Sequence, residues 1–438
     1  MTTLLRPFDV ARRAAVVAAG VLVASGAMAQ VPLEQAVHDL ESPDAAVRLR
    51  TVQLLKDARH PDSAIAVSKL AADVDDLVQL DAIAASLEFF LDDEVEPGPR
   101  GRRIPVLFGG RRSGAEAAFL GGASVLGTAP VPGEVLVALG VATRDDNPRV
   151  ASEALYAFGT LASDLDGAPR LALQRTSASD LAALVSAVHP GLRRGAVRVI
   201  GRLYARAAGE AAVDETVGDA LVSALNDTDG QVRSAAMEAL GALRYDRSVK
   251  ALSDLVRFYE RGSGAEEALN ALAHIAHPSS AELFTELLKH RQPGMRRVAV
   301  EGLARLGDAK ATSVIDEALS REVDDSVMLA ARFAAVVLTN RNLDPISEAL
   351  FRGSLRDQAM TYLVEIASQR AALFLQQSMD PDERVRHDVT IALSSSTDPA
   401  AVQILERLSH DKDPQIARSA QRGLTRQRGP GAPKRRAA

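Results

Sequence analysis

The amino-acid sequence predicts an all-α fold, a right-handed solenoid of about ten helical hairpins that stack side by side. The first observation is an apolar pattern of helical period that returns about every 31 residues along the chain. The second is a helix-forming composition with 4% aromatic residues and no tryptophan. Since one helical hairpin cannot bury its own apolar face, neighbouring hairpins must share a continuous core. The 438 residues also exceed one ordinary globular core, and a repeat array accommodates that length along one axis.

The first 29 residues are predicted to be a signal peptide that is cleaved after Ala29. Arg12 and Arg13 end a basic segment, residues 14–26 are apolar, and Ala-Met-Ala at 27–29 matches a cleavage site. The apolar run is shorter than the roughly 20 residues of a membrane span, and no second candidate follows. We therefore expect an exported, periplasmic or otherwise extracytoplasmic protein without a transmembrane segment in the mature chain. Retention of the leader as an anchor is the alternative.

The net charge and the absence of cysteine exclude several classes of partner and site. The net charge is −6, and without the leader the chain carries 48 basic and 56 acidic side chains. An acidic chain disfavours nucleic acid as a partner. The absence of cysteine excludes disulfides, thiolate metal sites and a lipoprotein anchor. Stability must therefore come from packing.

Repeats are predicted in residues 30–91 and in the main array at 132–424. The clearest copy has a polar turn followed by apolar residues on one face of a helix, at Val232, Ala236, Ala239, Leu240 and Leu243. A further apolar helix precedes most copies, so each unit is a hairpin. Other copies start at Val47, Val78, Val150, Leu192, Gly264, Met295, Val327, Leu355, Val385 and Ile416.

These units resemble a known repeat family. The pattern Asp-x4-Val-Arg-x2-Ala-x2-Ala-Leu-Gly at 227–241, echoed at 380–393, resembles HEAT repeats of the short type also found in phycobilisome lyases. The resemblance covers most of residues 33–91 and 132–424. It implies a solenoid, while its implication for function is weak because such arrays serve as scaffolds, adaptors, lyases and occasionally hydroxylases.

An arginine follows the first apolar residue in several copies. We expect this side chain to bond carboxylates of its own turn, such as Asp227 or Asp229 beside Arg233, rather than a ligand. The arginines concerned are Arg48, Arg233, Arg296 and Arg386.

Residues 92–131 interrupt the repeats. Their acidic start and their many Gly, Pro and Arg residues predict a flexible insertion. Its basic and partly apolar centre is a candidate surface for a partner, a glycan or an anionic surface. The candidate contacts are Arg102, Arg103, Phe108, Arg111 and Arg112. Residues 425–438 are predicted to be a flexible basic tail.

No catalytic residue, metal site or cofactor is predicted. HEAT-like hydroxylases hold two irons with repeated His-Glu pairs, and this sequence has no His-Glu dipeptide. His274 and His277 lie three residues apart, but no carboxylate pair completes a site, and we expect them to cap a helix C-terminus. Phosphate loops and a Gly-x-Ser-x-Gly elbow are also absent. The prediction is a non-enzyme, with a HEAT-like enzyme or lyase of divergent, metal-dependent site as the alternative.

The concave surface is the predicted binding site. In curved helical repeats the second helices usually line the concave side, so positions two and six beyond each start should face the groove. If the true helix register differs by one position, these residues are packed in the core instead. The predicted function is a scaffold or adaptor that binds a protein or peptide of the cell envelope. The candidate residues are Tyr156, Arg194, Arg198, Glu238, Arg297, Glu301, Phe333 and Ile391, and Leu329 is expected to be exposed beside them.

Overall fold

The computed structural model describes residues 33–59, 61–91, 114–122, 126–127, 129–163, 165, 167–206, 213–259, 263–340, 342–396 and 398–428. The predicted signal peptide, residues 429–438 of the predicted tail and the loop candidates lie outside the described residues. Those loop candidates are Arg102, Arg103, Phe108, Arg111 and Arg112. Within the described part, β pairing is limited to one isolated bridge between Leu91 and Leu126.

The described helices form eleven hairpins, in each of which a first helical segment packs against a second helix. The first helices are α2 (Leu33–Asp39), α4 (Ala64–Ser68), α7 (Gly133–Ala142), α9 (Gly167–Leu184), α11 (Glu215–Ala224), α13 (Val249–Tyr259), α15 (Ala281–Leu287), α17 (Ala311–Ala318), α19 (Asp344–Ala349) and α22 (Pro399–Leu408). The second helices are α3 (Ala45–Asp57), α5 (Asp76–Glu88), α8 (Pro148–Ala162), α10 (Pro190–Leu203), α12 (Gly230–Leu243), α14 (Ser263–Ile275), α16 (Pro293–Leu306), α18 (Asp325–Thr339), α20 (Arg356–Arg370), α21 (Glu383–Ser394) and α23 (Pro414–Arg428).

Short 3-10 turns complete several hairpins. Before α21, the turns η6 (Ala371–Leu375) and η7 (Gln377–Met379) take the place of a first helix. The other turns are η1 (Pro61–Ser63), η2 (Lys69–Ala72), η4 (Asp246–Ser248) and η5 (Pro278–Ser280).

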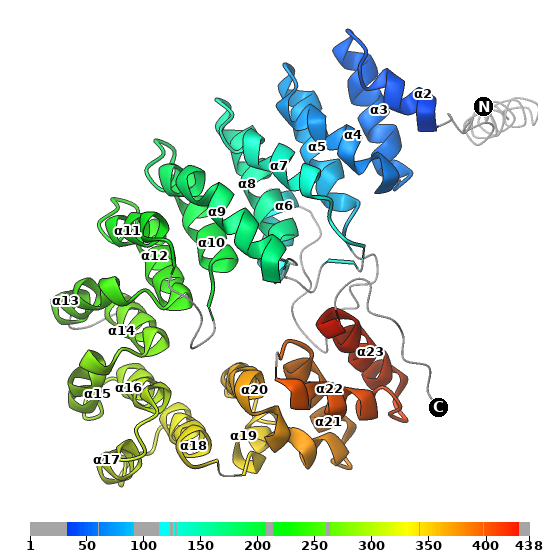
Figure 1. Cartoon of the computed structure of the whole chain (residues 1–438). Helices are drawn as coiled ribbons and strands as arrows, with labels where there is room; N and C mark the ends of the chain where they lie inside the picture. Colours follow the sequence, from blue (N-terminus) through cyan, green and yellow to red (C-terminus); the bar gives the residue numbers. More distant parts are fainter. Residues whose placement is uncertain are drawn as a thin grey trace, which may run out of the picture.

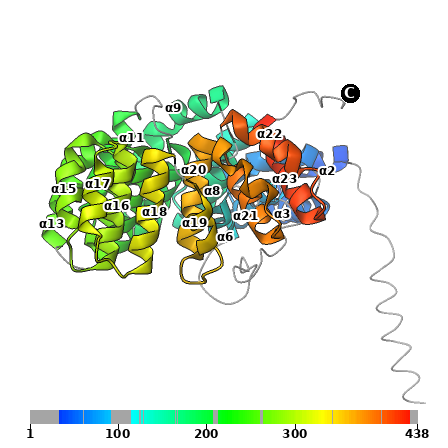
Figure 2. The ribbon, with the colours of Figure 1, turned by 90° about the horizontal axis from the view of Figure 1, so that it is seen from below.

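The hairpins stack into a curved array. Each second helix packs on the second helix of the next hairpin. The apolar core is continuous from α4 to α23, while residues of α2 and α3 form a separate cluster with residues of α4 and α5. Small residues permit this close approach, since a Cβ added at Gly241 would lie 3.1 Å from the backbone of Ala271. Figure 1 shows an arc in which α23 returns toward the N-terminal half, with α12, α14, α16 and α18 on its inner side. Figure 2 shows the same arc from below. The predicted all-α solenoid is confirmed.

Arginines at the start of second helices join neighbouring hairpins. Arg193 of α10 donates to both carboxylate oxygens of Asp227, in the turn of the next hairpin, at 2.7 and 2.8 Å. It also donates to two carbonyl oxygens of its own turn. The same geometry recurs in the pairs Arg48 with Asp73, Arg296 with Glu322 and Arg386 with Asp411.

Arg48, Arg296 and Arg386 bind turn carboxylates as expected, but the expected turn is wrong, because each carboxylate belongs to the following repeat. Arg233 shows why: it donates to the carbonyl oxygens of Asp227 and Thr228, while the Asp227 carboxylate is bound by Arg193. Asp229 instead accepts from the backbone N–H of Gln231 and caps α12. Arg48, Arg193, Arg296 and Arg386 thus each fix one hairpin against the next, whereas Arg233 bonds carbonyl oxygens of its own turn.

Part of the segment predicted to be flexible is helical. Residues Gly114–Gly121 form α6, which packs on α8. The base of the insertion is closed by the bridge between Leu91 and Leu126, and Gly127 N–H donates to the carbonyl of Phe90 at 2.8 Å. The last repeat also extends beyond its predicted end at residue 424, since α23 continues to Arg428. Apolar packing against the repeats explains the order of α6, because Ala115, Ala118 and Phe119 are buried.

Candidate functional site on the concave surface

On the second helices α10 and α16, three positions spaced by four residues face the inner helices α6 and α20. On α10 they carry Arg194, Arg198 and Arg202, and on α16 they carry Arg297, Glu301 and Arg305. Residues spaced by four lie on one face of a helix, so each set forms a row. Figure 1 places both α6 and α20 on the inner side of the arc.

The row on α10 binds the carboxylate of α6. Arg198 Nη1 donates to Oε1 of Glu116 at 3.3 Å, and Arg194 Nη2 lies 3.9 Å from the same oxygen. The Glu116 residue is only 8% exposed, so the two guanidinium groups compensate a carboxylate that has left most of its water. The insertion thus supplies an acidic helix to a basic row.

The ring of Phe119 completes the contact three residues further along α6. The guanidinium carbon of Arg202 lies 3.6 Å from the ring centroid, and Arg202 also donates to the Phe119 carbonyl oxygen. The ring packs against Tyr156 of α8 with centroids 5.4 Å apart. Gly159 makes room, since a Cβ there would lie 3.0 Å from Phe119 Cε2. Burial and the Glu116 charge raise the pKa of the Tyr156 phenol.

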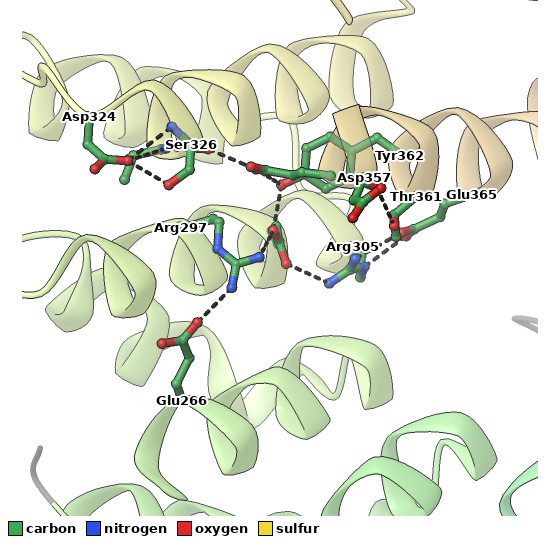
Figure 3. Close-up of polar contacts among 12 residues, drawn as sticks. Glu266, Arg297, Arg305, Asp324, Ser326, Asp357, Thr361, Tyr362 and Glu365 are labelled. Atoms are coloured by element: carbon green, nitrogen blue, oxygen red, sulfur yellow. Dashed lines mark hydrogen bonds and ion pairs between the residues drawn. The ribbon is translucent and has the colours of Figure 1, made fainter. Parts of the chain in front are cut away.

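The row on α16 binds α20 with similar chemistry (Figure 3). Tyr362 donates its hydroxyl proton to Glu301 Oε1 at 2.5 Å. Arg305 donates through Nε and Nη2 to the two oxygens of Glu365, each at 2.8 Å. Arg297 reaches Glu301 Oε1 at 3.2 Å. The contacts join the hairpin of α15 and α16 to the hairpin of α19 and α20. The hairpin of α17 and α18 lies between these two in the sequence.

Burial strengthens this second cluster. The side chains of Arg305 and Glu301 are each 4% exposed, and Phe333 stacks on Tyr362 with centroids 4.3 Å apart. Burial and the Glu301 charge raise the pKa of Tyr362 well above its ordinary value. Burial alone would raise the pKa of Glu365, but the hydrogen bonds and charge of Arg305 lower it. The Tyr362 phenol therefore keeps its proton at neutral pH and the Glu365 carboxyl loses it.

The cluster is suited to holding helices together. Its phenol and carboxylates are engaged by fixed partners, and Arg297 also pairs with Glu266 of α14 at 2.7 Å. His274 of α14 lies nearby; burial, with the positive charge of Arg305, lowers its pKa to about 4. Across the described ranges, no group of three His, Cys, Asp or Glu residues is placed to hold a metal ion. In the same ranges no helix is long and apolar enough to cross a membrane.

Four residues expected to be exposed in the groove are buried, so that part of the prediction is wrong. Tyr156 lies beneath α6, while Glu301 and Phe333 lie beneath Tyr362 of α20. Leu329 is 2% exposed and lies near Ala349 and Leu355. The physical reason is that other helices of the chain cover the inner faces of α8, α16 and α18. The other candidates, Arg194, Arg198, Glu238, Arg297 and Ile391, remain partly or fully exposed.

The sequence pattern missed several residues that make these contacts. Arg202 and Arg305 follow at the third inward position, ten residues beyond each start. For Arg202, the four-residue spacing from Arg194 and Arg198 was the available signal. Glu116, Tyr362 and Glu365 carry no such signal. The expected role of His277 is also wrong, since its Nδ1 accepts from Ser279 N–H and caps the start of η5.

Comparison with known proteins identifies the repeats. The family model for HEAT repeats matches residues 178–258, 260–335 and 344–425. No curated protein matches the sequence significantly. An engineered protein solved by the Northeast Structural Genomics Consortium is 18% identical, with 91% of this chain and 99% of that chain covered. Its TM-score is 0.43. The likeness to the phycobilisome-lyase type stays a prediction. Since the three matched segments together span more than half of the sequence, the chain belongs to the HEAT-repeat family.

Proposed function

We propose that the chain is an exported, non-catalytic scaffold or adaptor that binds a protein partner of the cell envelope through its concave surface. A HEAT-repeat array is a helical scaffold capable of protein binding. One observation carries the proposal: the inner surface already holds two helices of the chain itself, α6 and α20, through side chains of the second helices.

The two contacts share a chemical pattern. Each docked helix presents an aromatic ring and a carboxylate three residues apart, Glu116 with Phe119 on α6 and Tyr362 with Glu365 on α20. Each carboxylate meets an inward-facing arginine, and Phe119 also lies under the guanidinium of Arg202. A helix laid into a groove with apolar anchors is a common mode of recognition between separate chains. The inner surface is therefore suited to helices of a partner.

Site-specific photo-crosslinking in cells tests the binding surface. We expect a photoreactive phenylalanine at Glu238, Asn270 or Ile391 on second helices to give an adduct with one partner. Matched positions on first helices, Val137 and Phe258, are 65% and 79% exposed and should give no such adduct. Adducts from the first helices, with none from any of the three inner positions, would contradict the proposal.

The location is tested separately by cell fractionation and N-terminal sequencing. We expect the mature chain in the extracytoplasmic fraction to begin at Gln30, because the sequence before it matches a signal peptide. An Ala29→Arg variant should accumulate as the longer precursor, since signal peptidases require a small residue there. A chain that stays in the cytoplasm and retains Met1 would contradict export.

A further inference from the structure

We infer that α21 and α23, at the C-terminal end of the arc, form an open copy of the surface that holds α6. Its occupant is an acidic amphipathic helix of a partner protein, with a carboxylate and an apolar side chain three residues apart. The inference rests on the proposed scaffold function and adds to it the position of one binding site and the chemistry of its ligand.

The helices α10 and α23 present the same row of arginines. The core face of α10 includes Leu192, Ala196 and Ile200, and that of α23 includes Ile416, Ala420 and Leu424 at identical spacing. When the sequences of the two helices are aligned on these core positions, Arg194, Arg198 and Arg202 correspond to Arg418, Arg422 and Arg426. The sequence therefore gives both helices an Arg-x3-Arg-x3-Arg pattern, and Arg418 and Arg422 take the positions on α23 that Arg194 and Arg198 take on α10.

The neighbouring helices correspond as well. Helix α8 packs on α10, and α21 packs on α23, as preceding second helices of the array. Val150 and Ala154 of α8 correspond to Val385 and Val389 of α21, which places Ile391 at the position of Tyr156. Tyr156 forms the apolar floor under Phe119, whereas Ile391 is 42% exposed. The C-terminal copy therefore combines basic side chains with an accessible apolar one.

The arginines of this copy are available. Arg418 and Arg422 are both exposed. Arg422 donates to Ser419 Oγ at 3.4 Å, and within the described ranges no ion pair joins either arginine to a carboxylate. In the α10 copy, by contrast, Arg194 and Arg198 share Glu116. Charge complementarity therefore favours an acidic ligand, in the manner that Glu116 demonstrates.

The likeness also defines the apolar contact. Ser394 of α21 stands where Gly159 of α8 makes room for Phe119. Because its side chain occupies part of that recess, we expect an aliphatic residue such as leucine to fit better than phenylalanine. The preferred motif is a glutamate followed three residues later by leucine on one helix face.

The outer face of α23 disfavours a second copy of the chain as the occupant. The apolar pattern of α12 starts at Val232, and Gly241 lies nine residues later. Gly241 packs closely on Ala271 of α14, the next second helix. The equivalent position of α23 is Thr425, and Gln421 lies one turn before it; both are exposed. A polar outer face suits a terminal repeat and opposes end-to-end stacking. The concave face, rather than this end, is the docking surface.

A stapled helical peptide with the α6 sequence, in which leucine replaces the phenylalanine, is the probe. With the mature full chain we expect saturable binding by fluorescence anisotropy that weakens as salt is raised. The double variant Arg418→Glu and Arg422→Glu should lower the affinity at least tenfold, as should replacing the peptide glutamate with glutamine. The matched control, Arg257→Glu with Arg291→Glu, reverses two exposed charges elsewhere and should leave the affinity unchanged.

Three results would overturn the inference. They are no saturable binding, binding that survives reversal of Arg418 and Arg422, and binding that is lost instead with Arg198→Glu, which would place the peptide in the α6 site. None of these touches the proposed scaffold function, which depends on adducts from Glu238, Asn270 or Ile391 in cells. The two proposals can therefore fail separately.

Discussion

Replacing Arg305 by methionine is expected to destabilise the α16–α20 contact by roughly 3 to 5 kcal/mol, the cost of removing one partner from a buried ion pair. The side chain is 4% exposed and donates two hydrogen bonds to Glu365. It also lies 3.5 Å from Glu301. Without the guanidinium, Glu365 loses its charged partner and the buried Glu301 keeps only Arg297 as a charged partner. The measurement is urea denaturation combined with amide hydrogen exchange across residues 356–370.

Two further variants distinguish this mechanism from a general effect of losing an arginine. Arg247→Met removes an ion pair with Glu215 whose side chains are 55% and 75% exposed, and it should change stability by less than about 1 kcal/mol. Arg305→Met combined with Glu365→Met should recover part of the loss, because the second substitution removes a stranded charge. If Arg305→Met costs no more than Arg247→Met, the cluster does not hold α20 in place.

Acidification is expected to destabilise the folded chain through His274. The pKa of this side chain is about 4 when folded, because burial and Arg305 oppose its charge, against 6.5 for the free group. Above the unfolded pKa both states are neutral. As the pH falls from 6.5 toward 4, the unfolded state binds a proton that the folded state does not, so the free energy of unfolding falls. We expect a loss on the order of 2 kcal/mol between about pH 7 and pH 5.

The variant His274→Gln isolates this contribution. It should flatten the dependence of unfolding free energy on pH within that interval, because glutamine does not titrate there. The matched change His38→Gln replaces an exposed histidine of α2 and should leave the slope unaltered. The charged groups around His274 are Arg305, Glu365 and Arg244, and Glu365 stays ionised because its pKa is lowered. An equal slope in the parent chain and in His274→Gln would contradict the assignment.

The two helices on the inner surface also bear on the shape of the scaffold. In an ideal repeat array each unit contacts only its neighbours. Here Tyr362 and Glu365 of α20 reach back to Glu301 and Arg305 of α16, past the intervening hairpin. Such contacts fix the curvature at this point of the arc, so variants that release α20 should alter the surface offered to a partner.

The sequence alone determined the repeat architecture, since helical periodicity and capping are local properties. The apolar spacing that starts at Val232 placed the core face of α12, and Asp229 caps that helix as its position in the turn implies. The arginine at the start of several second helices could also be recognised as structural. Its carboxylate could not be located, because it lies in the following repeat.

Only the tertiary structure decided which inward-facing positions are free. Tyr156, Glu301 and Phe333 occupy the positions that the register predicts, yet α6 and α20 cover them. Arg198 meets Glu116 across 82 residues of sequence, and Arg305 meets Glu365 across 60. Helical periodicity tells which side of one helix faces the core, but exposure of the opposite side depends on whether a distant segment docks there, and no local pattern carries that information.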